Sequence, residues 1–321
     1  MRIRPLAALS AAALSAVLLA GCASSNTPDA DSTPTPTSTS SDCGLDPKSG
    51  SDSDAITVSG SAPSLTAQAP TDLAFSELQR TTATKGDGDD LASGQLVSGQ
   101  YLVIDPSTGE VAMDSATTSP DDSGLVPIIV DPSSIFGTGV LCTPLGSTTT
   151  LTIPGSMLSQ GASNVVVAMQ TVEQLPTTAT GADQEPVAGM PEVALDKDGK
   201  PTITVADDFT APDTTQIAVL KKGDGPTVNS GDQVFVQYLG VLPDGTEFDS
   251  SWSRGAPTSF QTTGVVQGFQ KALEGQTVGS QVIAVIPAAE GYGDQAQGSI
   301  PANSPLIFVV DILGVQRTPQ Q

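Results

Sequence analysis

The chain has 321 residues, with 35 acidic side chains, 12 basic ones and no histidine. The lack of histidine excludes Ser-His-Asp catalysis, and three cysteines without histidine exclude an ordinary structural zinc site. The net charge of -23 argues against nucleic acid as a partner, because such binding depends on Lys and Arg side chains that meet phosphates. The 32 Gly and 25 Pro residues, with only 4% aromatics, favour turn-rich β structure with polar linkers over helical bundles.

The N-terminal residues predict an export signal rather than part of a fold. Two arginines precede an uncharged Ala/Leu-rich run over residues 6–19, which at about 14 residues is short for a membrane-spanning helix. The run ends in Leu19-Ala20-Gly21-Cys22, which resembles the lipobox of bacterial lipoproteins. An ordinary secretory signal followed by a chance cysteine is the alternative. We expect a signal peptide over residues 1–21 and lipidation of Cys22, which would anchor the exported protein to the outer face of the bacterial cytoplasmic membrane.

Two polar stretches predict connecting segments. Residues 23–42 contain 14 Ser, Thr or Pro in 20 positions and show no hydrophobic period, so residues 22–53 are expected to form a disordered tether. Such a tether would hold a folded module clear of the membrane. The second stretch, from Leu175 to Met190, contains prolines, threonines and glycines and predicts a linker over residues 174–192.

An internal repeat flanks the predicted linker. Lys85-Gly86-Asp87-Gly88 recurs as Lys222-Gly223-Asp224-Gly225, and Tyr101-Leu102 recurs as Tyr238-Leu239, both 137 residues further on. Ordered matches with few insertions indicate two copies of one domain. We place these copies at residues 54–173 and 193–317.

The downstream copy shows the clearer pattern of elements. Residues 234–241 are rich in β-branched and aromatic types, and Pro243-Asp244-Gly245 signals a turn before Phe248, which predicts a hairpin. Apolar residues at helical spacing over 265–273 predict one short helix. Residues 282–286 and 306–313 predict two further strands. Antiparallel strands around one amphipathic helix give an α+β domain.

Seven short segments between Ile217 and Val315 follow one another in a recognisable order. They are Gly223-Asp224-Gly225, Val236-Gln237-Tyr238, Asp244-Gly245 with Phe248-Asp249-Ser250-Ser251, Val265-Val266-Gln267-Gly268-Phe269, Gly291-Tyr292-Gly293, Ile300-Pro301 and Leu306-Ile307-Phe308-Val309-Val310. Together they resemble the FKBP-type peptidyl-prolyl cis-trans isomerase family. The resemblance implies a bent antiparallel sheet wrapped around a short helix, present twice, with the upstream copy divergent.

The resemblance also implies a substrate pocket with named residues. It gives catalytic roles to Phe248, Asp249, Phe269 and Tyr292, with Phe269 as the pocket floor. It gives substrate binding to Tyr238, Arg254, Val265, Val266, Ile300 and Phe308. Thr258 stands where the family has an aromatic residue, which would open one wall. The implied partners are Xaa-Pro segments of unfolded or exported proteins and the macrolide ligands of the family, and no cofactor or metal is required.

The chemistry needs little more than such a pocket. Rotation about an Xaa-Pro bond crosses a barrier of ~18–20 kcal/mol, and no bond is made or broken. An apolar pocket disfavours the charge-separated amide and so favours its twisted form. Taken singly, Phe269 and Phe308 could equally be core residues and Asp249 a turn residue, so only the ordered set supports the prediction. A non-catalytic peptide-binding or chaperone lipoprotein on the same fold is the alternative function.

The upstream copy is expected to lack a complete site. Tyr101 is retained, Met113-Asp114 is matched to Phe248-Asp249, and Phe136 is matched to Phe269. The chain from Pro154 to Val167 is eight residues shorter than the chain from Pro287 to Phe308, which would remove the loop that carries Tyr292.

Two cysteines, Cys43 and Cys142, remain after lipidation of Cys22. An exported chain meets an oxidising environment, so an even number of remaining cysteines suggests a disulfide. Two free buried thiols are the alternative.

Overall fold

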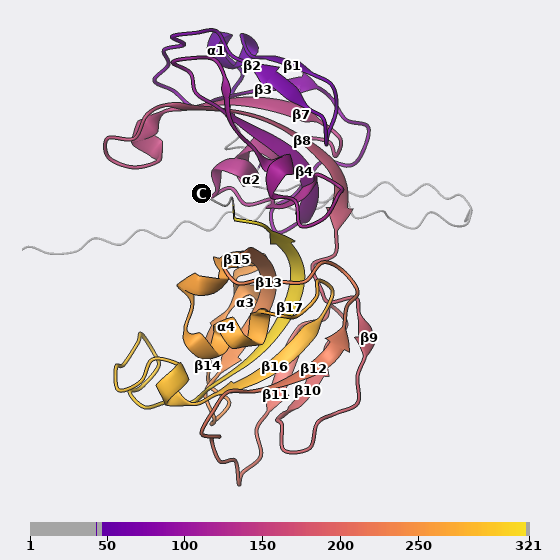
Figure 1. The fold of residues 1–321 in the computed structure, drawn as a ribbon, viewed down its shortest axis with the longest axis vertical. Helices are drawn as coiled ribbons and strands as arrows, with labels where there is room; N and C mark the ends of the chain where they lie inside the picture. The colour runs from indigo at the N-terminus through magenta and orange to yellow at the C-terminus, as the bar shows by residue number, and fades with distance from the viewer. Residues whose placement is uncertain (1–42, 44–46, 319–321) are drawn as a thin grey trace, which may run out of the picture. The chain divides into compact units, whose positions relative to one another are not determined.

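The computed structural model describes Cys43 and residues 47–318, which contain two large β-sheets with short helices (Figure 1). The predicted signal peptide, the lipidation site at Cys22 and most of the predicted tether lie outside these residues. Across the described ranges, no helix is both long and apolar enough to span a bilayer.

The downstream sheet contains seven antiparallel strands. Their order is β14-β13-β17-β16-β12-β9, and β15 also pairs with β13. β13 pairs with β15 through its first half and with β14 through its second half. A bulge against β17 lies between Phe235 and Val236, within the first half of β13, and such bulges bend a strand. The strands are β9 (Ala182–Asp183), β12 (Gln216–Lys222), β13 (Gln233–Val241), β14 (Glu247–Ser250), β15 (Thr258–Gln261), β16 (Gln281–Ile286) and β17 (Leu306–Gln316).

One helix packs on the concave face of this sheet. α4 (Gln267–Leu273) buries Phe269, Ala272 and Leu273, which lie on one side of the helix, among apolar residues of β13, β16 and β17. The helix ends just before Gly275, whose φ of +83° gives the left-handed conformation common after a helix. The shorter helical turns are α3 (Ser251–Arg254), η4 (Thr262–Gly264) and η5 (Ala288–Glu290). The hairpin and helix predicted from the sequence are therefore confirmed.

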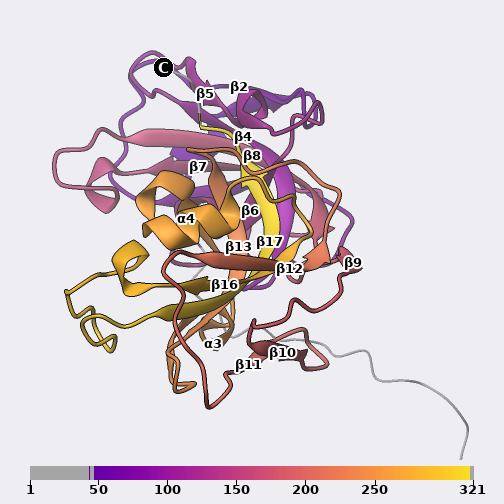
Figure 2. The same cartoon turned by 60° about the horizontal axis from the view of Figure 1, so that its bottom comes forward.

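A separate hairpin covers the other face of the downstream sheet. β10 (Glu192–Leu195) and β11 (Pro201–Thr204) pair with each other, and Ile203 is buried against Ile283 and Ile307. Figure 2 shows this hairpin on the side of β12 and β16 that faces away from α4. Both faces of the sheet are thus covered, which explains the nearly continuous burial of β16 and β17.

The upstream sheet has the same strand order without a counterpart of β9. Its order is β5-β4-β8-β7-β3, with β6 also paired to β4, and α2 (Ile135–Val140) packs on one face. A hairpin of β1 (Thr57–Ser59) and β2 (Thr66–Gln68) lies by the other face, where Ile56 and Ala69 are buried with Ile104. The strands are β3 (Gln79–Thr84), β4 (Leu96–Ile104), β5 (Val111–Asp114), β6 (Val126–Ile129), β7 (Thr148–Ile153) and β8 (Val165–Leu175); the other turns are η2 (Ser115–Thr118) and η3 (Gly155–Met157).

The end of the predicted tether is folded onto the upstream sheet. α1 (Ser51–Asp54) contacts β3 and β7, and Ser53 is completely buried. Gln79 Oε1 accepts the backbone N–H groups of Asp52 and Ser53, at 3.1 and 3.2 Å. The expectation of disorder up to residue 53 is therefore wrong for this turn, because side chains of β3 satisfy its backbone.

A disulfide joins Cys43 to Cys142, with the Cα atoms 5.8 Å apart. Cys142 directly follows α2 and Leu141, and its φ is +58°. The bond connects chain positions 99 residues apart and ties Cys43 to the upstream sheet.

The predicted linker is bound to the downstream sheet over part of its length. β9 pairs with β12, and Gly181 N donates to Gly279 O at 2.9 Å. Ala179 N donates to Asp311 Oδ2 at 3.0 Å, inside the protein. These contacts make residues 179–183 part of the downstream sheet rather than free connecting chain.

Candidate active site

A pocket of about 480 Å3 lies at the concave face of the downstream sheet, beside α4. Nine of the ten residues predicted for the pocket line it, although they come from six different parts of the chain. These nine are Tyr238, Phe248, Asp249, Val265, Val266, Phe269, Tyr292, Ile300 and Phe308. The fold therefore assembles the predicted set around one cavity.

The bottom of the pocket is a cluster of aromatic rings. Phe269 and Phe308 are 4.8 Å apart between ring centroids, and Phe248 meets Phe308 edge-to-face at 5.3 Å and 87°. Phe269 and Phe308 are both buried. This geometry gives Phe269 the position expected of the floor and provides an apolar surface for a proline ring.

Gly240 on β13 makes room for two of these rings. A Cβ atom at this position would lie 2.7 Å from Phe248 Cζ and 2.8 Å from Phe308 Cε1. Any other residue must displace at least one ring, since contacts this short do not occur. The glycine is therefore part of what shapes the pocket.

Tyr238, Asp249 and Arg254 form a hydrogen-bonded group at the pocket rim. The Tyr238 hydroxyl donates to Asp249 Oδ2, and Arg254 donates through Nη1 to Asp249 Oδ1 and through Nη2 to the Tyr238 oxygen, the last at 2.9 Å. Burial, followed by the hydrogen bond to Asp249, raises the pKa of Tyr238 to about 12. Burial opposes ionisation of Asp249, but hydrogen bonds from Tyr238 and Arg254 outweigh it and hold the Asp249 pKa below its usual value. At neutral pH the group is a neutral phenol, a carboxylate and a guanidinium.

Arg254 lies at the rim, paired with Asp249, and does not line the cavity itself. It is the last residue of α3, which Ser250 caps by accepting the N–H of Ser253, and Gly255 with φ +79° ends the helix. From there the guanidinium carbon lies 5.4 Å from the centroid of the Tyr238 ring. One turn of helix thus carries Arg254 to the rim, where it holds Asp249 and Tyr238 in position.

Tyr292 stands on a short turn after η5 at the mouth of the pocket. The turn is closed by Gly293, whose N–H donates to Ala288 O at 2.8 Å and whose φ is +60°. Tyr292 is 38% exposed, and its hydroxyl makes no hydrogen bond with any residue that the structure describes. The hydroxyl is therefore available to a substrate carbonyl.

Sequence reasoning missed part of the pocket wall. Phe260 lies 5.6 Å from Tyr238 and 5.8 Å from Phe269 between ring centroids, whereas Thr258 is not in the lining. Phe260 forms part of this wall, and its position as the only aromatic residue on β15 is the signal that could have shown it. The opening expected at Thr258 stays a prediction. The other unpredicted lining residues are Gly264, Gln297, Gly298 and Ser299.

The upstream sheet has no counterpart of the rim group. Strand pairing places Met113 opposite Val103 and Asp249 opposite Gly240. Met113 therefore stands where Asp249 stands, and the expected match of Asp114 to Asp249 is wrong by one residue. Asp114 instead caps η2 by accepting the N–H of Ala116.

Two serines confirm this register. Ser115 Oγ accepts the N–H of Tyr101, and Ser251 Oγ accepts the N–H of Tyr238, both at 2.8 Å. Each serine begins a four-residue turn, so the last residue of η2, Thr118, occupies the place of Arg254. The upstream sheet has thus kept the tyrosine but carries neither the acid nor the arginine.

The downstream pocket can hold an apolar ring and orient an amide. The described residues include no group of three or more His, Cys, Asp or Glu side chains that could hold a metal ion. The residues around the pocket supply aromatic rings that exclude water, the fixed dipoles and charges of the rim, and the hydroxyl of Tyr292.

Residues 225–313 match the family described as FKBP-type peptidyl-prolyl cis-trans isomerase. Over 102 residues the chain is 39% identical to the FKBP-type peptidyl-prolyl cis-trans isomerase FkpA of Escherichia coli (strain K12), which covers 32% of this chain and 38% of FkpA. Over 113 residues it is 42% identical to FK506-binding protein 1 of Debaryomyces hansenii, which covers 33% of this chain and 99% of that protein.

A solved structure also matches part of this chain. The crystal structure of FkpA from Escherichia coli covers 40% of this chain and 53% of that chain, with 34% identity and a TM-score of 0.32. In the sequence comparison the chain spans 38% of FkpA but 99% of FK506-binding protein 1. Since that relative is 42% identical and matched along almost its whole length, the chain belongs to the FKBP-type peptidyl-prolyl cis-trans isomerase family.

Proposed function

We propose that the protein is a peptidyl-prolyl cis-trans isomerase that assists the folding of exported proteins. The observation that supports this most directly is the downstream pocket, in which buried phenylalanines lie beside the hydrogen-bonded group of Tyr238, Asp249 and Arg254. The substrates would be Xaa-Pro segments of unfolded chains. The macrolide ligands of the family would compete for the same pocket.

Catalysis would come from desolvation and orientation. The proline ring would lie on Phe269 and Phe308, where an apolar environment disfavours the charge-separated planar amide and lowers the cost of twisting it. The Tyr292 hydroxyl would donate to a substrate carbonyl. A roughly 1000-fold acceleration needs only about 4 kcal/mol of differential stabilisation, which a dry pocket with one or two oriented dipoles can supply.

Asp249 would act through its charge and its hold on Tyr238, not as a base. Both of its carboxylate oxygens already accept hydrogen bonds, and its lowered pKa keeps it ionised at neutral pH. Through this hold the carboxylate would keep the polar groups of the rim oriented towards the twisting amide.

We further propose that the upstream sheet is a second, divergent FKBP-like copy without isomerase activity. The shared strand order supports duplication, and Met113 and Thr118 in place of the acid and the arginine support the loss of activity. We also propose that a lipid on Cys22 anchors the protein to the outer face of the cytoplasmic membrane. The Cys43–Cys142 disulfide fits an oxidising compartment.

The test is a protease-free isomerisation assay on a short Leu-Pro peptide with the full chain. Asp249→Asn and Tyr292→Phe preserve shape, so each should lower kcat/KM by about tenfold or more while far-UV spectra stay unchanged. Full activity in both variants would contradict the site. Binding of the peptide without acceleration by the wild type would support the non-catalytic alternative.

The location is tested by replacing Cys22 with Ser. The wild type should partition with membranes, and the Cys22→Ser protein should be released or left unprocessed. Membrane retention of a correctly cleaved Cys22→Ser protein would contradict the lipid anchor.

A further inference from the structure

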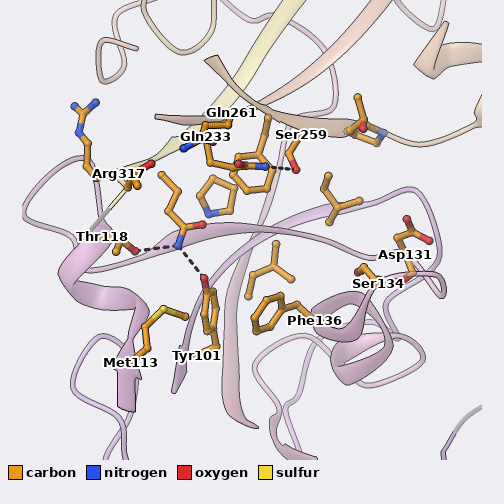
Figure 3. Close-up of a pocket in the computed structure, with 18 residues that line it drawn as sticks. Tyr101, Met113, Thr118, Asp131, Ser134, Phe136, Gln233, Ser259, Gln261 and Arg317 are labelled. Carbon is orange, nitrogen blue, oxygen red and sulfur yellow. Dashed lines mark hydrogen bonds between the residues drawn. The ribbon is translucent and has the colours of Figure 1, made fainter. Parts of the chain in front are cut away.

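A groove of about 550 Å3 lies between the two copies, next to β15 (Figure 3). Its downstream wall includes two strand pairs of β13 and β15, namely Phe235 with Ser259 and Gln233 with Gln261. Neighbouring residues of a strand point to opposite faces. Phe260 therefore lines the catalytic pocket while Ser259 and Gln261 line the groove, so the two sites are separated by a single strand.

The upstream wall is what remains of the upstream copy's own pocket. Tyr101 and Phe136, the counterparts of Tyr238 and Phe269, contact each other with ring centroids 4.2 Å apart. Ile128 and Met113 continue this apolar surface. The aromatic surface that would hold a proline ring in an active copy has thus been kept, and it faces the groove (Figure 3).

Contacts between the copies hold the two walls at a fixed spacing. Gln316, at the end of β17, donates through Nε2 to the Tyr101 hydroxyl at 2.8 Å and to Thr118 Oγ1 at 2.9 Å. Leu96 from the upstream copy is buried with Phe235 and Leu313 from the downstream copy. The groove is therefore a built feature of the folded chain rather than a gap between loosely joined domains.

The lining of the groove is nearly uncharged. Of its residues, only Asp131 and Arg317 carry a charge, and Arg317 is paired with Asp232. Met113 and Thr118 stand where the active copy has a carboxylate and a guanidinium. The remaining polar groups are amides and hydroxyls, which can serve the backbone of a bound chain. This chemistry suits an extended, uncharged segment with apolar side chains.

We propose that this groove binds a second segment of the client polypeptide, extended and apolar, while an Xaa-Pro bond of the same client lies in the catalytic pocket. The inference rests on the proposed isomerase function and names a further part of its substrate. Because only β15 separates the two sites, one client can reach both, and the second contact becomes intramolecular. Such linkage raises affinity without changing the chemistry at the proline.

The first test measures peptide affinity by fluorescence anisotropy with the full chain. The short probe is a labelled tetrapeptide with one Leu-Pro bond, and the long probe is a 20-residue peptide in which alternating Leu and Ser flank the same bond. Met113→Asp places a carboxylate in the apolar wall, at a position where the downstream copy accommodates Asp249. We expect the variant to bind the long probe about tenfold more weakly and the short probe unchanged.

Val111→Asp is the matched control, because Val111 lies on the same strand, is 41% exposed and does not line the groove. It should bind both probes like the wild type. Equal affinity of Met113→Asp and wild type for the long probe would overturn the proposal. If the wild type does not accelerate isomerisation of the short probe, the proposed function is contradicted instead. Failure of the groove proposal and failure of the proposed function are therefore distinguishable.

The second test locates the bound segment by NMR with methyl-labelled methionine. The chain has five methionines, and the signal of Met113 is identified by its absence in Met113→Asp. The long probe should shift the Met113 signal and leave that of Met157, which is 58% exposed and outside the groove, unchanged. An unmoved Met113 signal would overturn the proposal. Deletion of residues 319–321 is a further test. At least tenfold tighter binding of the long probe by the shortened chain would also overturn the proposal, because the chain's own C-terminal residues would then be the occupant of the groove.

Discussion

The Glu290 carboxylate accepts hydrogen bonds from both the backbone N–H and the hydroxyl of Thr215, at 3.2 and 2.5 Å. The same carboxylate is paired with Lys271 on α4 at 2.8 Å. One side chain outside the pocket thus ties the turn that carries Tyr292 to the helix that carries Phe269. The distance between the mouth and the floor of the pocket depends on this connection.

Replacing Glu290 with Ala should free the Tyr292 turn and lower kcat/KM on a short Xaa-Pro peptide by about tenfold, since small displacements of positioning groups carry penalties of this order or larger. Glu247→Ala is the control, because it removes another carboxylate of the same domain that lies outside the pocket lining. Equal activities of the two variants would show that the turn holds itself in place.

Acid should weaken the same connection. The hydrogen bond from Lys271, followed by those from Thr215, lowers the pKa of Glu290 to about 2. The folded pKa therefore lies below the unfolded value of about 4.3, so the stabilisation is fully present above that value and is lost as the pH falls towards 2. In urea titrations, the midpoints of the wild type and Glu290→Ala should converge between pH 5 and pH 2.5. A constant difference would contradict this linkage.

Gly240→Ala should damage the pocket without touching substrate. The added methyl group must push Phe248 or Phe308 aside, which typically costs about 1–3 kcal/mol of stability and here also moves the apolar floor. We expect lower activity and a lower urea midpoint together. Val103→Ala, at the equivalent upstream position, should leave isomerase activity unchanged. An active and fully stable Gly240→Ala protein would mean that the ring pair can shift at no cost.

Isomerase activity should be nearly independent of pH between 6 and 8. The chain has no histidine, the pKa of Tyr238 is raised to about 12 and that of Asp249 is lowered, so none of these groups changes charge in this range. We expect kcat/KM on a short peptide to vary by less than about twofold. A bell-shaped profile would point to general acid-base catalysis and against desolvation.

Asp311 should make the stability of the protein depend on pH. Burial raises its pKa to about 6, although Gln281 and Ala179 donate hydrogen bonds to it. The folded pKa lies above the unfolded value of about 3.9, so its contribution is fully present below that value and is lost as the pH rises through 6. Relative to Asp311→Asn, the wild type should lose roughly 2–3 kcal/mol of unfolding free energy between pH 4 and 7.5. If the difference in unfolding free energy between the two proteins stayed constant across this pH range, the raised pKa of Asp311 would be contradicted.

Local periodicity and turn signals were enough to predict the hairpin and the helix, and the resemblance of the ordered segments to a known family implied nine residues of the pocket. The correspondence between residues of the upstream and downstream hairpins was not predictable in this way. Met113-Asp114-Ser115 and Phe248-Asp249-Ser250 match by their shared Asp-Ser pair, and only the hydrogen bonds of Ser115 and Ser251 to neighbouring strands show the one-residue shift. The groove depends on how the two copies pack, which no local pattern encodes.

The pairing of β9 with β12 matters for anyone who divides this protein into fragments. β9 lies in the segment predicted to be a linker, yet it covers the edge of the downstream sheet. Asp183 also pairs with Lys221 at 2.9 Å. A fragment that starts at residue 193 would leave that edge open, and open edges recruit strands from other molecules. It would also lose the N–H of Ala179, which helps to satisfy the buried Asp311 carboxylate. An autonomous downstream unit therefore begins no later than residue 178, within the apparent linker.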